Sequence, residues 1–418
     1  YYAAKYGVDM DLLTRGAGFG YLGSTITSLI YASFTFIFFA IEAAIMAHAL
    51  KLCLNVPLWL GYIISALAVI PLVTHGITLI SRFQTWTQPL WIILHLLPFV
   101  FIAKQSPQSF VDWSSFAGQH GDASGGFNIL QYGAAATVAM SLVVQIGEQV
   151  DFLRFLPRPT PQTRRHWWIA LVCAGPGWII PGALKLLAGS FLAFLALQHE
   201  VPIDQAGEPT QMYLTAFTYV FSSPSAALVA AGLFVIVSQL KINITNAYAG
   251  SIAWSNFFAR VTHSHPGRVV WVVFNVVIAL LLTEFGIFKA LETILGLYAN
   301  VAIAWVGALV ADLVINKPLG LSPPSIEFKR AHLYDINPVG IGAMAFATLV
   351  SMAAYAGVLG AICQALSAFL AFGVAFAAAP VIARLSGGKF YLARKPKTEW
   401  SGALLLRCCV CEHSFEPQ

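Results

Sequence analysis

The chain has 418 residues and a formal net charge of +5, and 58% of its residues are apolar while only 10% are charged. An ordinary soluble domain carries about 25% charged residues, so these side chains could not solvate the surface of a soluble globule of this length. Lysine and arginine form no patch interleaved with exposed aromatic residues, which sets a nucleic-acid partner aside.

Ten stretches are apolar and long enough to predict a polytopic α-helical membrane protein, because a spanning helix needs about 20 mainly apolar residues. In chain order they cover residues 25–49, 55–80, 86–103, 128–150, 167–197, 224–252, 269–288, 292–315, 338–362 and 365–384. The third stretch is short. The fifth is long, and its Gly175-Pro176-Gly177 and Pro181 predict a kink.

Basic residues lie in alternate connections between these stretches. The connection after the fourth stretch and the segment from Arg384 to Arg407 are rich in arginine, whereas the opposite connections hold only Lys51, Lys104 and Lys289. By the positive-inside rule, this asymmetry predicts that both ends of the chain are cytoplasmic, in a multi-pass protein of the inner membrane.

Four ionisable residues fall inside the predicted spans, where they are costly and are therefore functional candidates. They are Glu42, Glu148, Lys185 and Lys241. Helical spacing places them on polar faces. The faces group Phe38 with Glu42, Gln145 with Glu148 and Gln149, and Ser238 with Lys241 and Thr245, beside Gln239, Asn243 and Asn246.

These faces combine an aromatic ring with carboxylate and amide groups, which suits binding of a flat, polar heterocycle. The alternative is a structural network in which Glu42, Glu148 and Lys241 neutralise one another. Lys185 could snorkel or pair with a helix end, and His95 is interpreted as a hydrogen-bonded packing residue. The spans show no nucleophile motif and no phosphate-binding loop, so no enzyme and no cofactor are expected.

Three short motifs resemble the nucleobase–cation symporter family, of the purine/cytosine permease type. The first is Tyr2-Ala3-Ala4-Lys5-Tyr6-Gly7 with Leu13, Arg15 and Gly20, which is similar to the segment after the family's second helix. The second is Asp151-Phe152-Leu153-Arg154-Phe155, and the third is Ala311-Asp312-Leu313 with Asn316-Lys317. The resemblance covers about residues 1–390.

The resemblance implies a fold of two inverted five-helix repeats followed by two helices, with the first two helices absent from this chain. We therefore expect a fragment of a longer protein. It also implies that Phe38 stacks on the solute, that Glu42 hydrogen-bonds it, and that Asn246 holds its far edge. Lys241 falls where the family has one hydroxyl of a sodium site, so coupling to a proton, coupling to sodium through Ser238, and loss of coupling all stay open.

The last residues turn basic and polar, and we divide the chain into a membrane domain, 1–390, and a cytoplasmic tail, 391–418. The tail contains Cys408 and Cys411, half of a zinc motif whose second pair is absent. Permease-like bundles also resemble the membrane part of bacterial sensor histidine kinases. The main prediction is a secondary transporter of a nucleobase-like solute in the lipid bilayer; the alternative is a solute-sensing module with a signalling domain beyond the tail.

Overall fold

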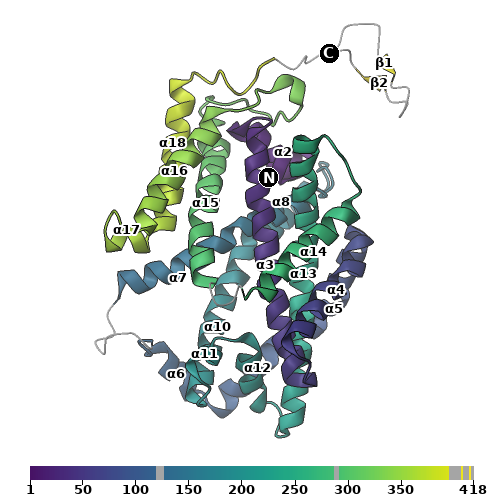
Figure 1. Cartoon of the computed structure of the whole chain (residues 1–418), viewed down its shortest axis with the longest axis vertical. Coiled ribbons are helices and arrows are strands. Elements are labelled where there is room, and N and C mark those ends of the chain that lie inside the picture. Colours follow the sequence, from purple (N-terminus) through teal and green to yellow (C-terminus); the bar gives the residue numbers. More distant parts are fainter. Residues whose placement is uncertain (119–126, 287–290, 395–405, 408–413, 416–418) are drawn as a thin grey trace.

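A computed structural model of the chain describes residues 1–118, 127–286, 291–394, 406–407 and 414–415. Within these ranges the chain is almost wholly helical (Figure 1). One antiparallel strand pair joins β1 (Leu406–Arg407) to β2 (Ser414–Phe415).

The helices of the first half of the chain are listed here in order. They are α1 (Tyr2–Tyr6), α2 (Met10–Thr14), the π-helical η1 (Arg15–Phe19), α3 (Gly23–Leu54), α4 (Leu58–Thr74), α5 (Ile77–Gln105), α6 (Gln108–Ser114), α7 (Ile129–Ser141), the 3-10 turn η2 (Leu142–Gln145), α8 (Ile146–Leu153), α9 (Arg164–Ala174), the 3-10 turn η3 (Pro176–Trp178) and α10 (Ile179–Gln198).

The helices of the second half continue this order. They are α11 (Ile203–Ala206), α12 (Pro209–Thr218), α13 (Pro224–Thr262), α14 (Arg268–Glu284), α15 (Leu291–Ala311), the π-helical η5 (Asp312–Asn316), the 3-10 turn η6 (Arg330–His332), α16 (Pro338–Tyr355), α17 (Ala361–Ala365) and α18 (Ser367–Leu385).

Within the described residues, each of the ten apolar stretches contains a helix. Among the described residues, eight helical segments are long and apolar enough to cross a membrane. The other two predicted spans correspond to α4 and α14, which have 17 residues each. At 1.5 Å per residue such a helix is about 26 Å long, at the lower end of the range for spanning helices.

The third stretch was predicted too short. The structure extends it to α5, a helix of 29 residues that begins at Ile77 and passes through Pro89 and Pro98. The second stretch was predicted to end at residue 80, but α4 ends at Thr74, and residues 77–80 belong to α5. The polar residue Gln84, in the predicted connection 81–85, is accommodated in α5 because its side chain donates to the Lys241 carbonyl of α13.

The ends of two further stretches also differ from the prediction. The sixth stretch continues as a helix beyond residue 252 to Thr262. Its last turns are polar, so the run of apolar residues did not indicate them. The ninth ends at Tyr355 rather than at residue 362, and Gly357 and Gly360 then adopt positive φ angles of 83° and 89°.

Two spans are irregular. The predicted kink is confirmed in the fifth, where α9 ends at Ala174 and η3 precedes α10. The fourth tightens at η2, a 3-10 turn between α7 and α8 whose flanking residues keep right-handed helical angles. Such a turn inside a helix often marks a functional hinge, so η2 is a natural place for a binding site.

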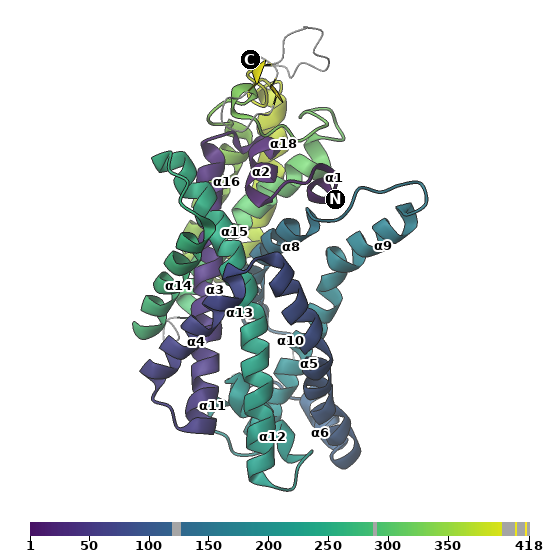
Figure 2. The same ribbon diagram turned by 90° about the vertical axis from the view of Figure 1, so that its right-hand side faces the viewer.

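α3 forms the centre of the bundle and packs along α13, with α4 and α14 beside them (Figures 1 and 2). α15, α16 and α18 pack on one another as a second group. α1 and the segment after α18 lie at the same end of the bundle: the ammonium of Lys317 lies 6.0 Å from the ring centroid of Tyr2, and Asn316 donates to the hydroxyl of Tyr391. This end also carries α2 and the end of α8.

Candidate functional site

Two amide side chains of α13 turn towards α3. Asn243 donates from Nδ2 to the carbonyl oxygen of Phe39 at 3.4 Å, and Asn246 donates to Oδ1 of Asn243 at 3.3 Å. Each asparagine is 1% exposed. Both bonds are longer than the usual 2.9–3.0 Å for N–H···O. The one bond that reaches α3, from Asn243, therefore holds that helix only weakly.

The 3-10 turn η2 brings polar groups of α8 to the same region. Glu148 lies in the first turn of α8 and is 4% exposed. The side chains of Gln145 and Thr245 face its carboxyl group, but its Oε1 atom has no hydrogen-bond partner. A buried carboxyl oxygen without a donor is costly, which distinguishes Glu148 from the bonded groups around it.

Phe38 and Glu42 lie on one face of α3, as their spacing indicates. The Phe38 ring is buried and lies 4.6 Å from that of Phe34, centroid to centroid. Glu42 faces Lys185 of α10 across the bundle, and the Lys185 ammonium lies 5.2 Å from the ring centroid of Trp91. The charge opposite Glu42 is therefore Lys185, not Lys241 as in the structural network that the sequence left open.

Ser238 and Lys241 face α5. Lys241 Nζ donates to the Gln84 carbonyl and to Thr87 Oγ1, each at 3.0 Å, while Gln84 Nε2 donates to the Lys241 carbonyl at 2.8 Å. Trp91 Nε1 donates to Ser238 Oγ at 3.2 Å. Thr245, the third residue of the expected ion site, faces Glu148 of α8 instead.

A hydrogen-bonded histidine lies next to this α5–α13 contact. The hydroxyl of Tyr213 on α12 and Nδ1 of His95 are 2.7 Å apart, and the His95 ring stacks on Trp91 with centroids 5.0 Å apart. This arrangement fits the interpretation of His95 as a packing residue. The contact of Trp91 with Lys185 was not foreseen, because α5 and α10 are distant in sequence. The stack of Trp91 on His95 joins residues i and i+4 of one helix, so helical spacing was a signal for it.

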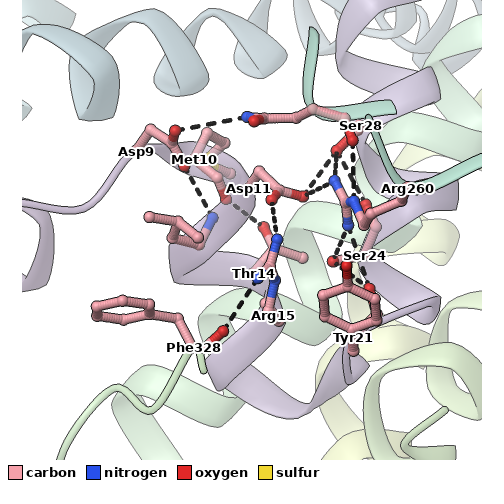
Figure 3. Close-up of polar contacts among 12 residues, drawn as sticks. Asp9, Met10, Asp11, Thr14, Arg15, Tyr21, Ser24, Ser28, Arg260 and Phe328 are labelled. Carbon is pink, nitrogen blue, oxygen red and sulfur yellow. Dashed lines mark hydrogen bonds and ion pairs between the residues drawn. The ribbon is translucent and has the colours of Figure 1, made fainter. Parts of the chain in front are cut away.

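A second polar region lies at the end of the bundle that holds α2 (Figure 3). Arg260 of α13 donates to Asp11, Ser24 and Ser28. Arg15 donates to Asp11 Oδ2 at 2.8 Å and to the Phe328 carbonyl at 3.0 Å. The side chains of Asp11 and Arg260 are each 3% exposed, so this is a buried, charge-assisted set of bonds.

Neighbouring carboxyl groups extend this region to α8. Asp9 accepts from Leu12 N at 2.9 Å and from Arg154 Nη1 at 3.4 Å. Burial raises the pKa of Asp9, and the nearby Asp11 raises it further, against the opposing effect of Arg154. Asp151 accepts from Met10 N and from the Tyr31 hydroxyl, each at 3.0 Å. We call the set Asp9, Asp11, Arg15, Asp151, Arg154 and Arg260 the α2 charge cluster.

Known proteins share the fold of this chain. The transporter Mhp1 of the nucleobase-cation-symport-1 family, in a closed conformation with bromovinylhydantoin bound, matches with a TM-score of 0.57 and 16% identity over 92% of this chain and 81% of that chain. An inward-facing conformation of Mhp1 matches with a TM-score of 0.66 and 16% identity over 93% and 80%. The fold is that of the Mhp1 transporter. No family model and no curated protein matches.

The Mhp1 fold confirms the predicted class, an all-α multi-pass membrane protein of the transporter type, but not the number of spans. At 16% identity the likeness concerns the fold alone.

The three sequence motifs meet at the α2 end of the bundle. The first and second motifs are in contact: Asp151 accepts a hydrogen bond from Met10 N, and Arg154 forms an ion pair with Asp9. In the third, Asp312 accepts hydrogen bonds from Asn316 and Tyr391 and lies 3.8 Å from Lys317 Nζ. Burial lowers the pKa of Lys317, and Asp312 opposes that shift.

The motif residues indicated the family resemblance and were not predicted to form a site. Their positions at the ends of predicted spans were the one sequence feature that could have indicated a polar cluster there. Arg260 had no such signal, because its partner Asp11 is 249 residues away.

The predicted half zinc motif, Cys408 and Cys411, lies outside the described residues. Within the part of the chain that the structure describes, no group of three or more histidine, cysteine, aspartate or glutamate side chains could hold a metal ion. The candidate site is therefore the polar region between α3, η2–α8 and α13, with the α2 charge cluster next to it towards the end of the bundle that holds α2.

Proposed function

We propose that this chain is a secondary transporter domain that binds a flat, polar, nucleobase-like solute and moves it across the membrane. The observation that carries the proposal is the 3-10 turn η2 within the helix α7–η2–α8, which brings polar side chains of α8 beside α3 and α13 within a transporter fold. Transporters of this kind bind their substrates at interrupted helices near the middle of the fold. Bromovinylhydantoin, held by Mhp1 in one of the matching structures, contains a flat, polar ring.

The side chains around η2 can supply what such a ring needs. Phe38 would offer an aromatic face, Glu42 and Gln145 would accept or donate at one edge, and Asn243 and Asn246 would hold the other. The asparagines are available because their present bonds of 3.4 and 3.3 Å are long and neutral, so exchanging them for bonds to a solute costs little. Glu148 lies beside these side chains, and its Oε1 atom has no hydrogen-bond donor from the protein.

We further propose that binding is independent of sodium. Lys241 places an ammonium group where the resembling family has a sodium-site hydroxyl, and its bonds to Gln84 and Thr87 tie α5 to α13. A cation fixed at this position would repel sodium. We place the protein in the inner membrane with both ends cytoplasmic, because the basic connections alternate along the chain. No observation favours the sensor alternative.

Equilibrium binding of purines, pyrimidines and hydantoins to the purified protein, with and without sodium, tests this function. We expect binding that does not change with sodium and that weakens about tenfold or more in Glu42→Gln, since a hydrogen bond to a charged group contributes about 1.5–3 kcal/mol. Glu200→Gln, in an exposed connection, is the matched control and should bind as the wild type does.

Three results would contradict the proposal in separate ways. Undiminished binding in Glu42→Gln would remove the assigned pocket, and sodium-dependent affinity would remove the role of Lys241. Binding of none of the panel would exclude a nucleobase-like solute.

A further inference from the structure

We propose that Glu148 and Asp151 of α8 form a proton-binding site, and that a proton held there moves with the solute. This inference rests on the proposed transport function and names its coupling ion. It concerns a part of the bundle next to, but distinct from, the asparagines that face the solute.

The two carboxyl groups lie three residues apart and therefore on one face of α8. Both are buried, with 4% of Glu148 and 0% of Asp151 exposed. The Tyr31 ring of α3 lies directly against the intervening Gly147, where a Cβ atom would approach the ring to 2.5 Å. The Tyr31 hydroxyl donates to Asp151 Oδ2 at 3.0 Å. Tyr31 thus holds α8 with its carboxyl groups inside the bundle.

The ion pairs near these two carboxyl groups include neither of them. Arg15 and Arg260 pair with Asp11, and Arg154 pairs with Asp9. The donors to Asp151 are a backbone N–H and a phenol, which are neutral. Among the described residues, no ion pair forms with Glu148 or Asp151.

The site and the α2 charge cluster together contain three guanidinium groups and four carboxyl groups, so one bound proton balances their charge. The guanidinium groups are those of Arg15, Arg154 and Arg260, and the carboxyl groups are those of Asp9, Asp11, Glu148 and Asp151. The excess negative charge is least stabilised at Glu148, because its buried Oε1 atom has no hydrogen-bond donor. An ionised carboxyl group in that state is costly, and protonation removes the cost. The reaction is the reversible conversion of one carboxylate and a proton into a carboxylic acid, with no other bond formed or broken.

Groups on the surrounding elements do not supply another charge to the site. The charged and titratable groups that face it are Tyr31 of α3, Asp9 and Asp11 beside α2, Arg154 after α8 and Arg260 of α13. Lys5 of the adjacent α1 instead lies over the rings of Tyr1 and Tyr6.

The site lies between η2 and the α2 charge cluster, which gives a proton a route. On one side Glu148 faces Gln145 of η2 and Thr245 of α13. On the other, a cavity of about 10 Å³ is lined by Asp151, Tyr31, Asp11, Ser28 and Asn256. This volume is close to the space that one water molecule needs. A proton could therefore pass from Asp151 towards the end of the bundle.

Infrared spectroscopy of the purified protein without solute tests the site itself. We expect the C=O stretching band of a protonated carboxyl group at neutral pH, weakened in Glu148→Gln or Asp151→Asn and unchanged in Glu200→Gln. Tyr31→Phe keeps the ring but removes a donor to the carboxylate, so the band should persist to higher pH. Absence of the band from the wild type, or a band in both carboxyl variants as strong as in the wild type, would overturn the site.

Uptake into proteoliposomes tests the coupling. A proton gradient directed inwards should raise solute uptake several-fold in the wild type and in Glu200→Gln, and this gradient dependence should be lost in Asp151→Asn. Solute uptake by the wild type that does not change with the proton gradient would overturn proton coupling. Absence of any solute uptake by the wild type would instead contradict the proposed function, while the infrared result would still decide whether the carboxyl groups bind a proton.

Discussion

The two polar regions of the bundle differ in the strength of the bonds between their side chains. In the α2 charge cluster, buried arginine and aspartate groups pair directly, as Arg260 does with Asp11. In the region between α3 and α13, neutral amides make bonds of 3.3 and 3.4 Å. Charge-assisted bonds are roughly twice as strong as neutral ones. The α2 charge cluster therefore fixes the helices in place, whereas the amides of Asn243 and Asn246 can exchange their partners for a solute.

The largest effect should follow from breaking the cluster. Arg260→Met leaves Asp11 with Arg15 as its one remaining cation among the described residues and removes the bonds of Arg260 to Ser24 and Ser28. Loss of one partner of a buried ion pair costs about 3–5 kcal/mol, and Arg15 offsets part of that cost. Thermal unfolding in detergent should show a large drop in unfolding temperature. Arg158→Ala, at an exposed arginine, is the control. Equal unfolding temperatures of the two variants would show that the cluster does not hold the bundle together.

The amide region should behave in the opposite way. Asn246→Ala should weaken solute binding about tenfold, equivalent to about 1.4 kcal/mol. Its effect on stability should be below about 0.6 kcal/mol, the average for a hydrogen bond between membrane helices, because the bond of Asn246 to Asn243 lies within α13. Binding isotherms and unfolding curves of the same preparation measure both. A variant that loses stability but binds normally would reverse the assignment of the two regions.

Asp9 provides a pH test of the cluster. Burial raises its pKa from the ordinary 3.8, so the folded protein holds this proton more tightly than the unfolded chain does. Its contribution to stability is therefore full below about pH 3.8 and declines as pH rises through the raised value. Asp9→Asn cannot ionise, so the stability of the wild type relative to this variant should fall from acid to neutral pH. A constant difference in unfolding temperature would contradict this.

The smallest effect is expected at the α5–α13 contact. Trp91→Phe removes the bond from Trp91 Nε1 to Ser238 Oγ but keeps an aromatic ring beside His95. The expected loss is about 0.6 kcal/mol, measured by thermal unfolding. A loss as large as that of Arg260→Met would mean that this contact, and not the cluster, fixes the helices.

The sequence was sufficient to predict the helices but not all of their irregularities. Runs of apolar residues identify membrane spans because lipid demands them, and Gly175-Pro176-Gly177 predicted the interruption before α10. The 3-10 turn η2 contains Leu142, two valines and Gln145, none of which disfavours a helix strongly enough to reveal it. Tertiary packing of α8 determines that turn, and packing is not visible in one sequence.

The candidate site was predictable only where neighbours in sequence are neighbours in space. Helical spacing correctly placed Phe38 with Glu42 on one face, and Gln145 with Glu148. It could not show that Lys185 of α10 faces Glu42, or that Arg260 pairs with Asp11, because these contacts depend on how distant helices pack. Lys241 was predicted to stand at an ion site, and its bonds to α5 could not be inferred from its own helix.

Counterflow of a labelled solute in proteoliposomes tests the central claim most directly. The solute is one that binds the purified protein. The account predicts saturable accumulation of label above that of protein-free vesicles, reduced in Asn246→Ala and unchanged in Glu200→Gln. Binding without any counterflow would contradict it and would mean that the chain is a receptor built on a transporter fold.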